Sequence, residues 1–159
     1  MSQNADELDL STGAAAIEFW IQVDSFNQLS VPLQLLRNYQ IKLYPTGVLE
    51  ATFKSGGNWY PVSGTPLSTN QWYHVSVNRD VVPNGSNVDV YVDVYVNGDL
   101  YASNAAAPFL NIPALEQSTA DLHIGFDAWG GSEFDGSFDG EIEELRISGR
   151  IHYGYDFDQ

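Results

Sequence analysis

The sequence predicts an all-β domain, a two-sheet antiparallel sandwich of the jelly-roll type. Apolar and polar residues alternate with a period of two through most of residues 16–147, which is typical of half-buried strands. Turn sequences rich in glycine, proline, asparagine and aspartate separate these alternating segments. No segment has the period of an amphipathic helix. About ten short strands joined by polar turns are typical of sandwiches and jelly rolls.

Five strands are expected in the first half of the chain. In the first of them, Ile17, Phe19 and Ile21 share one face, which we assign to the core. Asn38-Tyr39 is interpreted as a tight connection, and Pro45-Thr46-Gly47 as a turn, because proline presets φ and glycine accepts a positive φ. The expected strands cover residues 16–23, 31–37, 40–44, 48–53 and 59–62.

In the second half, strands are expected at residues 72–79, 88–96, 99–102, 121–126 and 140–147. The valines of the second of these all fall on one face: Val88, Val90, Val92, Val94 and Val96. Residues 103–120 are expected to be an irregular connection, and Leu122, Ile124 and Phe126 to point inward. Ile142 and Leu145 can share a face only if an extra residue is inserted, so we predict a β-bulge at Glu143-Glu144.

The bulk composition suits a single domain over residues 1–159. Hydrophobic residues make up 43% of the chain, which excludes a disordered chain. The formal net charge is −15, from 21 acidic and 6 basic residues. Such a charge repels phosphate backbones, so we expect no nucleic-acid partner. No apolar stretch approaches the length of a membrane span, so we expect no membrane insertion.

Five segments, taken in order, resemble the laminin-G-like domains of the concanavalin A-like lectin/glucanase superfamily. They cover residues 16–21, 70–77, 94–98, 122–125 and 138–147. The resemblance extends over almost the whole chain and implies a jelly roll of two antiparallel sheets. Arg146-Ile147-Ser148, followed by residues 150–157, is similar to the ending of such domains in bacteriophage tail-fibre and other virion surface proteins. His152 stands where those proteins usually have arginine.

Catalytic residues are not expected. Enzymes of this superfamily that cut polysaccharides carry clustered carboxylates on a strand, and Glu141, Glu143 and Glu144 resemble such a cluster. Leu145, however, stands where that pattern has a further acid, so we interpret Glu143 and Glu144 as solvent-facing. The histidines lack the spacing of metal ligands and are interpreted as sheet residues: His74, His123 and His152.

Calcium is the expected cofactor. It takes 6–8 oxygen ligands, and an acidic loop among glycines lets carboxylates and carbonyls converge. The candidate ligands in the loop of residues 127–139 are Asp127, Glu133, Asp135 and Asp139. The resemblance adds Asp6 and Glu7, because many relatives tie the N-terminal segment to the last strand through calcium. A flexible acidic loop that binds no ion is the alternative.

Sugar binding would need an exposed aromatic platform beside amides or acids. The candidates in or beside loops are Trp129, Trp59 and Tyr60, and a second set, on the polar face of the valine-rich strand, is Tyr91 and Tyr95. Trp20 and Trp72 fall within strands and are interpreted as packing residues.

The leading hypothesis is a non-enzymatic bacteriophage virion surface protein: a capsid decoration, fibre or tail component. It would be made in the host cytoplasm, and its partners would be other virion proteins or cell-surface glycans. The absence of a signal peptide in residues 1–7 favours this hypothesis. The alternative is a carbohydrate-binding or adhesion module of a secreted bacterial protein, placed outside the cell or on its surface. The sequence leaves the oligomeric state open.

Overall fold

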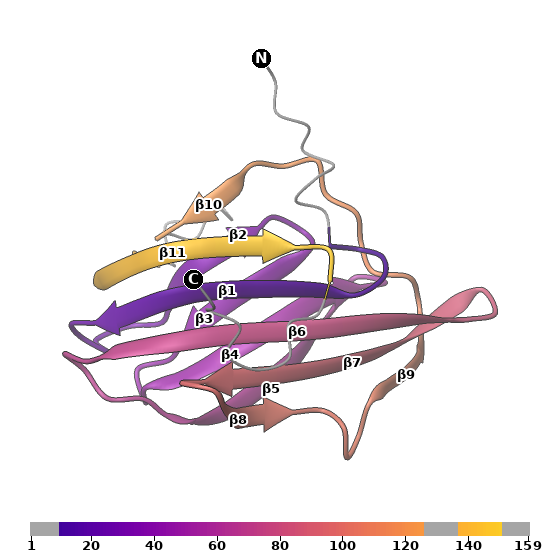
Figure 1. Ribbon diagram of the computed structural model, residues 1–159. Helices are drawn as coiled ribbons and strands as arrows, with labels where there is room; N and C mark the ends of the chain where they lie inside the picture. The colour runs from indigo at the N-terminus through magenta and orange to yellow at the C-terminus, as the bar shows by residue number, and fades with distance from the viewer. Residues whose placement is uncertain (1–9, 126–136, 151–159) are drawn as a thin grey trace.

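The computed structural model describes residues 10–125 and 137–150 (Figure 1). These residues form strands and turns, with no helix among them. The strands are β1 (Ala15–Val23), β2 (Ser30–Leu35), β3 (Tyr39–Leu43), β4 (Val48–Ser55), β5 (Asn58–Pro66), β6 (Trp72–Asn84), β7 (Asn87–Val96), β8 (Asp99–Ser103), β9 (Phe109–Ile112), β10 (Leu122–Ile124) and β11 (Gly140–Ser148). No helix in the described part of the chain is long and apolar enough to cross a membrane.

The strands form two antiparallel sheets that lie face to face, as Figure 1 shows. The six-stranded sheet has the order β11-β1-β6-β7-β8, with β9 paired to β7. The five-stranded sheet has the order β10-β2-β3-β4-β5. β8 pairs with residues 93–96 of β7 and β9 with residues 88–90, so both cover the same side of β7. The predicted two-sheet antiparallel sandwich is confirmed.

The core lies between the sheets, where the alternating apolar residues meet. Val90, Val92 and Val94 of β7 are buried, as predicted, and face the inward residues of the other sheet. One cation lies among them. Arg79 on β6 pairs with Val92, is 1% exposed, and places its guanidinium carbon 5.4 Å from the centre of the Phe53 ring. Its Nη2 also donates to the carbonyl oxygen of Gly13 at 3.3 Å.

The predicted β-bulge is present in β11. Glu18 and Trp20 of β1, two residues apart, pair with Arg146 and Glu143, three residues apart. Glu144 takes the extra position with a φ of 51°. The insertion lets Ile142 and Leu145 both pack against the core, which the alternation alone does not allow.

Three expectations about local structure are wrong. Tyr39 is not in a turn: it begins β3 and is fully buried, because its ring fills the core, while Arg37 takes the positive φ of the turn. The segment 103–120 is not wholly irregular, since β9 within it covers the open side of β7. Ile124 is 48% exposed because β10 is a three-residue strand at the sheet edge, where one flank is open.

Candidate functional site

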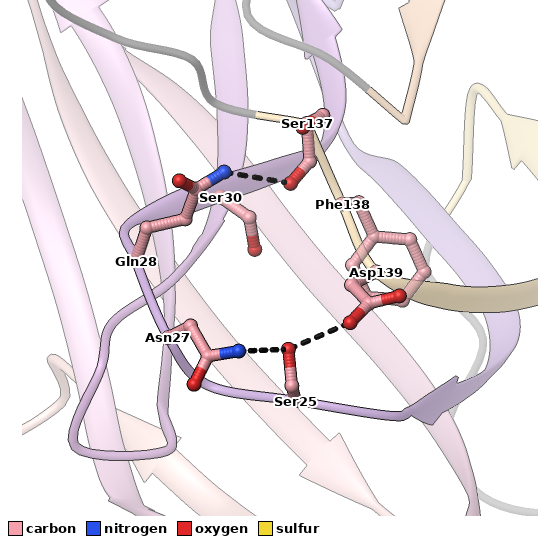
Figure 2. Close-up of a pocket in the computed structure, with 7 residues that line it drawn as sticks. All are labelled: Ser25, Asn27, Gln28, Ser30, Ser137, Phe138 and Asp139. Carbon is pink, nitrogen blue, oxygen red and sulfur yellow. Dashed lines mark hydrogen bonds between the residues drawn. The ribbon is translucent and has the colours of Figure 1, made fainter.

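A polar pocket opens at the end of the sandwich where β1, β2 and β11 come together; we call it the rim pocket (Figure 2). It encloses about 340 Å³. One wall comes from the β1–β2 connection and the start of β2, and the other from the residues just before β11. The lining residues are Ser25, Asn27, Gln28, Ser30, Ser137, Phe138 and Asp139.

Backbone contacts hold the two walls together. The N–H of Asp24 donates to the carbonyl oxygen of Asp139 at 3.0 Å, and the N–H of Phe138 donates to that of Gly125 at 2.8 Å. Gly140 then starts β11 beside Val23 with a φ of 151°. A Cβ at this position would lie 2.1 Å from the carbonyl oxygen of Gln22, so only glycine lets the backbones approach this closely.

The polar side chains of the rim pocket form short hydrogen-bonded chains (Figure 2). The Ser25 hydroxyl donates to Oδ2 of Asp139 at 2.7 Å and accepts from Nδ2 of Asn27 at 3.0 Å. Nε2 of Gln28 donates to the carbonyl oxygen of Ser137 at 3.4 Å. The half-buried ring of Phe138 packs against the core. The pocket therefore offers hydroxyl, amide and carboxylate groups around one aromatic ring.

Asp139 is the candidate calcium ligand that the structure places in this pocket. The other candidate ligands lie outside the described residues: Asp6, Glu7, Asp127, Glu133 and Asp135. Within the described ranges, no group of three or more histidine, cysteine, aspartate or glutamate residues could hold a metal ion. Calcium at this end of the sandwich stays a prediction.

The aromatic sugar-binding candidates lie apart from the rim pocket. Trp59 is half-buried on the outer face of the five-stranded sheet, whereas Tyr60 points to the other side of β5 and packs against Phe109, with ring centres 5.1 Å apart. Tyr91, 40% exposed, and the half-buried Tyr95 lie on the outer face of β7 in the six-stranded sheet. Trp129 lies outside the described residues.

The sequence analysis missed every lining residue of the rim pocket except Asp139. Ser25, Asn27 and Gln28 are polar residues that follow the strongly alternating first strand, with Phe26 among them, and Gly140 marks a close backbone approach on the other wall. These two signals are visible in the sequence. What joins them is the β1–β11 pairing, which brings together residues more than 100 positions apart.

The glutamates compared with a catalytic cluster lie on the edge strand β11. Glu141 and Glu143 are exposed, and Leu145 packs against the core in the position where a further acid would be needed. Asp139 is the one carboxylate among the described lining residues of the rim pocket. Glycoside hydrolysis uses two carboxyl groups that flank the scissile bond, so the described pocket lacks one of them.

His74 and His123 lie in strands, as expected, and His152 lies outside the described residues. The ring centres of His74 and Trp20 are 5.3 Å apart on the outer face of the six-stranded sheet. Burial lowers the pKa of His74, and the carboxylates of Glu18 and Glu144 oppose this shift.

A family model named Laminin_G_3 and described as the concanavalin A-like lectin/glucanases superfamily matches residues 2–151. No curated protein matches the chain.

Three solved structures illustrate the shared fold. A Bacteroides ovatus protein, assigned provisionally to carbohydrate binding, is 23% identical over 91% of this chain with a TM-score of 0.63. The CBM40 module of the Ruminococcus gnavus IT-sialidase, bound to α2,3 sialyllactose, is 14% identical over 91% with a TM-score of 0.55. Domains LG4-5 of the mouse laminin alpha1 chain are 12% identical over 100% with a TM-score of 0.57.

The chain spans 39%, 86% and 41% of the lengths of these three structures, in the same order. At such identities the likeness establishes the fold, and function has to be argued from the site.

Proposed function

Since the chain belongs to the concanavalin A-like lectin/glucanases superfamily, we propose that it is a non-enzymatic carbohydrate-binding module that holds a sugar in the rim pocket. The observation that carries this proposal is the arrangement of Ser25, Asn27 and Asp139 around the ring of Phe138. Sugar hydroxyls both donate and accept hydrogen bonds, and the apolar side of a pyranose ring packs against an aromatic side chain.

The size and chemistry of the pocket support this ligand class. Its volume of about 340 Å³ falls at the lower end of ligand pockets, which range from about 300 to 1,000 Å³. Asp139 accepts hydrogen bonds only, whereas the Asn27 amide both donates and accepts, so the two match the two roles of vicinal hydroxyls. A non-enzymatic role agrees with the single carboxylate among the described lining residues.

Two of the structural neighbours support a carbohydrate as the class of ligand. The Ruminococcus gnavus module is bound to a sialylated sugar, and the Bacteroides ovatus protein carries a provisional carbohydrate-binding assignment. This agreement bears on the kind of ligand and not on the position of the site. As a carbohydrate-binding module, the protein would act outside the cell or at its surface, with a glycan as its partner.

The test is glycan-array screening followed by calorimetry on the best neutral glycan. We expect Asp139→Asn and Asn27→Ala to weaken binding about tenfold or more, because a hydrogen bond to a charged group contributes about 1.5–3 kcal/mol. Asp99→Asn and Gln117→Ala, at exposed positions on other segments, are the matched controls. If no glycan binds, or if the pocket variants bind as the wild type does, the proposal is wrong.

A place on a bacteriophage virion is a second hypothesis. It rests on Arg146-Ile147-Ser148 at the end of β11 and on residues 150–157, of which residues 151–157 lie outside the described chain. Mass spectrometry of purified phage particles would test it: the protein should be present at a fixed ratio to the capsid protein. Its absence from particles would contradict the hypothesis without affecting sugar binding.

A further inference from the structure

The only two lysines of the chain lie together on one outer surface. Lys42 on β3 and Lys54 on β4 both lie on the outer face of the five-stranded sheet, close to the ring of Trp59 on β5. Each ammonium nitrogen is 5.8 Å from the centre of that ring. We call the surface formed by Lys42, Lys54 and Trp59 the Trp59 face. In a chain with a formal net charge of −15, this concentration of cations around one aromatic ring is unusual.

The strand register builds this surface. The intervening residues Ile41 and Phe53 are buried in the core, so their neighbours on β3 and β4 face outward. Lys54 pairs directly with Trp59 across β4 and β5, and Lys42 pairs with Glu50. The Trp59 ring is close to both ammonium groups, so it crosses β4 near Thr52. Thr52 lies on the outer face of the sheet and is nevertheless fully buried.

A carboxylate lies beside each of the two lysines. Nζ of Lys42 lies 3.8 Å from Oε1 of Glu50, beyond hydrogen-bonding distance. The oxygens of Glu50 accept instead from the hydroxyls of Tyr44, at 3.1 Å, and Ser63, at 2.9 Å. Burial raises the pKa of Tyr44, and the nearby Glu50, which accepts its hydrogen bond, raises it further.

The carboxylate beside Lys54 is that of Glu116. Nζ of Lys54 lies 3.3 Å from Oε2 of Glu116, and the other oxygen of that carboxylate accepts from the N–H of Gly57 at 2.8 Å. The Lys42 and Lys54 side chains are 20% and 13% exposed. Partly desolvated cations attract an anion more strongly than fully hydrated ones, and positioned cations lose less side-chain entropy on binding.

We propose that the Trp59 face is a second binding site, for an acidic sugar whose ring contacts the indole and whose carboxylate or sulfate accepts from Lys42. The inference deepens the proposed carbohydrate-binding function and rests on it for the ligand class. The ammonium of Lys42 has three donors, and its nearest carboxylate lies beyond hydrogen-bonding distance. A neutral sugar would use the aromatic ring but not this charge.

Charge elsewhere on the molecule favours an isolated anion over a polyanion. A nucleic acid or a long acidic peptide would bring its further charges against a protein with 21 acidic residues. A glycan that carries one acidic residue among neutral ones brings a single negative charge to the lysine pair and to the carboxylates of Glu50 and Glu116 beside it.

The test measures the ratio of affinities for an acidic oligosaccharide and its neutral counterpart. The probes are sialyllactose against lactose, and a uronic acid or sulfated disaccharide against the unsubstituted disaccharide. We expect the wild-type protein to prefer the acidic member by about tenfold, and Lys42→Gln to remove the preference while Lys42→Arg keeps it. Comparing the carboxylated with the sulfated probe tells which anion is preferred.

Three further variants separate the alternatives. Trp59→Ala should lose the acidic probe, and Asp139→Asn should leave the acidic preference intact. Arg150→Gln removes one exposed positive charge from another strand end and should have no effect. Thermal melting checks that each variant is folded.

The outcomes distinguish the two proposals. Binding of neutral glycans that depends on Asp139, with no acidic preference, overturns this inference and leaves the proposed function standing. An acidic preference that Lys42→Gln does not change also overturns it. Binding of poly-glutamate, but of no glycan, in a manner that depends on Lys42 would replace the sugar by an acidic protein partner and overturn both proposals.

Discussion

The rim pocket and the Trp59 face depend on different parts of the fold. The pocket joins two connections, residues 25–30 and 137–139, that are far apart in sequence and meet through backbone hydrogen bonds beside Gly140. The Trp59 face uses side chains of three strands that follow each other, β3 to β5, and its geometry follows from strand alternation. The pocket should therefore be sensitive to backbone changes, and the face to side-chain changes.

The largest loss of stability is expected from a core substitution that should remove the rim pocket and the Trp59 face together. Val92 is 1% exposed in the core beneath the six-stranded sheet, so Val92→Asp buries a charge with no partner. We expect unfolding to become easier by about 4 kcal/mol or more, measured by chemical denaturation. Tyr91→Asp, one position along on the outer face, should cost less than about 1 kcal/mol. Equal losses in the two variants would contradict the assigned faces.

A substitution at Gly140 should have a smaller effect, on the rim pocket and not on the Trp59 face. Gly140→Ala places a Cβ against the carbonyl oxygen of Gln22, so β11 and β1 must move apart beside the rim pocket. We expect a loss of about 2–3 kcal/mol in stability. In the folded fraction, neutral-glycan binding should weaken while the acidic preference stays. Gly149→Ala, where an added Cβ meets nothing within 4 Å, is the control. If both variants melt alike, Gly140 does not limit the approach of the strands.

The same contrast explains how much of each region could be predicted from the sequence. Alternation identified the buried valines of β7 and the bulge at Glu144, because side-chain period reports directly on which face is buried. The place of Trp59 beside a loop made it a sugar-binding candidate. Alternation could not pair Ser25 with Asp139, since that contact depends on which distant strands become neighbours. Nor could it show that Lys42 and Lys54 both lie close to one ring, which needs the register of three strands.

Arg79 shows a further limit of pattern analysis. It occupies an inward position of β6, where the alternation calls for an apolar residue, and its positive charge marks it as a surface residue. The Phe53 ring and the Gly13 carbonyl oxygen that accommodate it come from other segments, so the sequence near Arg79 carries no sign of its burial.

Calcium should act on the rim pocket alone. An ion bound only by the folded protein stabilises it by about 2.7 kcal/mol at a hundredfold excess over Kd. We expect millimolar calcium to raise the melting temperature, and Asp139→Asn to blunt the rise. Magnesium should do less, because it demands tighter octahedral geometry. Lys42→Gln should leave the calcium effect unchanged. If sodium chloride at equal ionic strength gives the same shift as calcium, the effect is general screening and no site exists.

The smallest expected effect is a pH dependence of stability caused by His74, which packs against Trp20. Trp20 packs against His74 on the six-stranded sheet, whereas Trp59 lies close to Lys42 and Lys54 on the five-stranded sheet. Burial lowers the pKa of folded His74 below its usual value of 6.5, despite the opposing carboxylates of Glu18 and Glu144. The pKa of His74 is lower in the folded protein than in the unfolded chain, so the contribution of His74 to stability is complete above pH 6.5. It is lost as the pH falls from 6.5 through the folded pKa.

Between pH 7 and pH 5, protonation of His74 should therefore lower the melting temperature by about 2 °C. His74→Gln should have a flatter pH dependence by that amount, and His123→Gln should keep the dependence of the wild type. An identical slope in all three proteins would mean that burial of His74 does not affect stability. The acidic preference of the Trp59 face should stay constant over the same range, because His74 contacts Trp20 on the other sheet and not Trp59. A preference that changed with pH in step with His74 would link the two outer faces, which the separate contacts of Trp20 and Trp59 argue against.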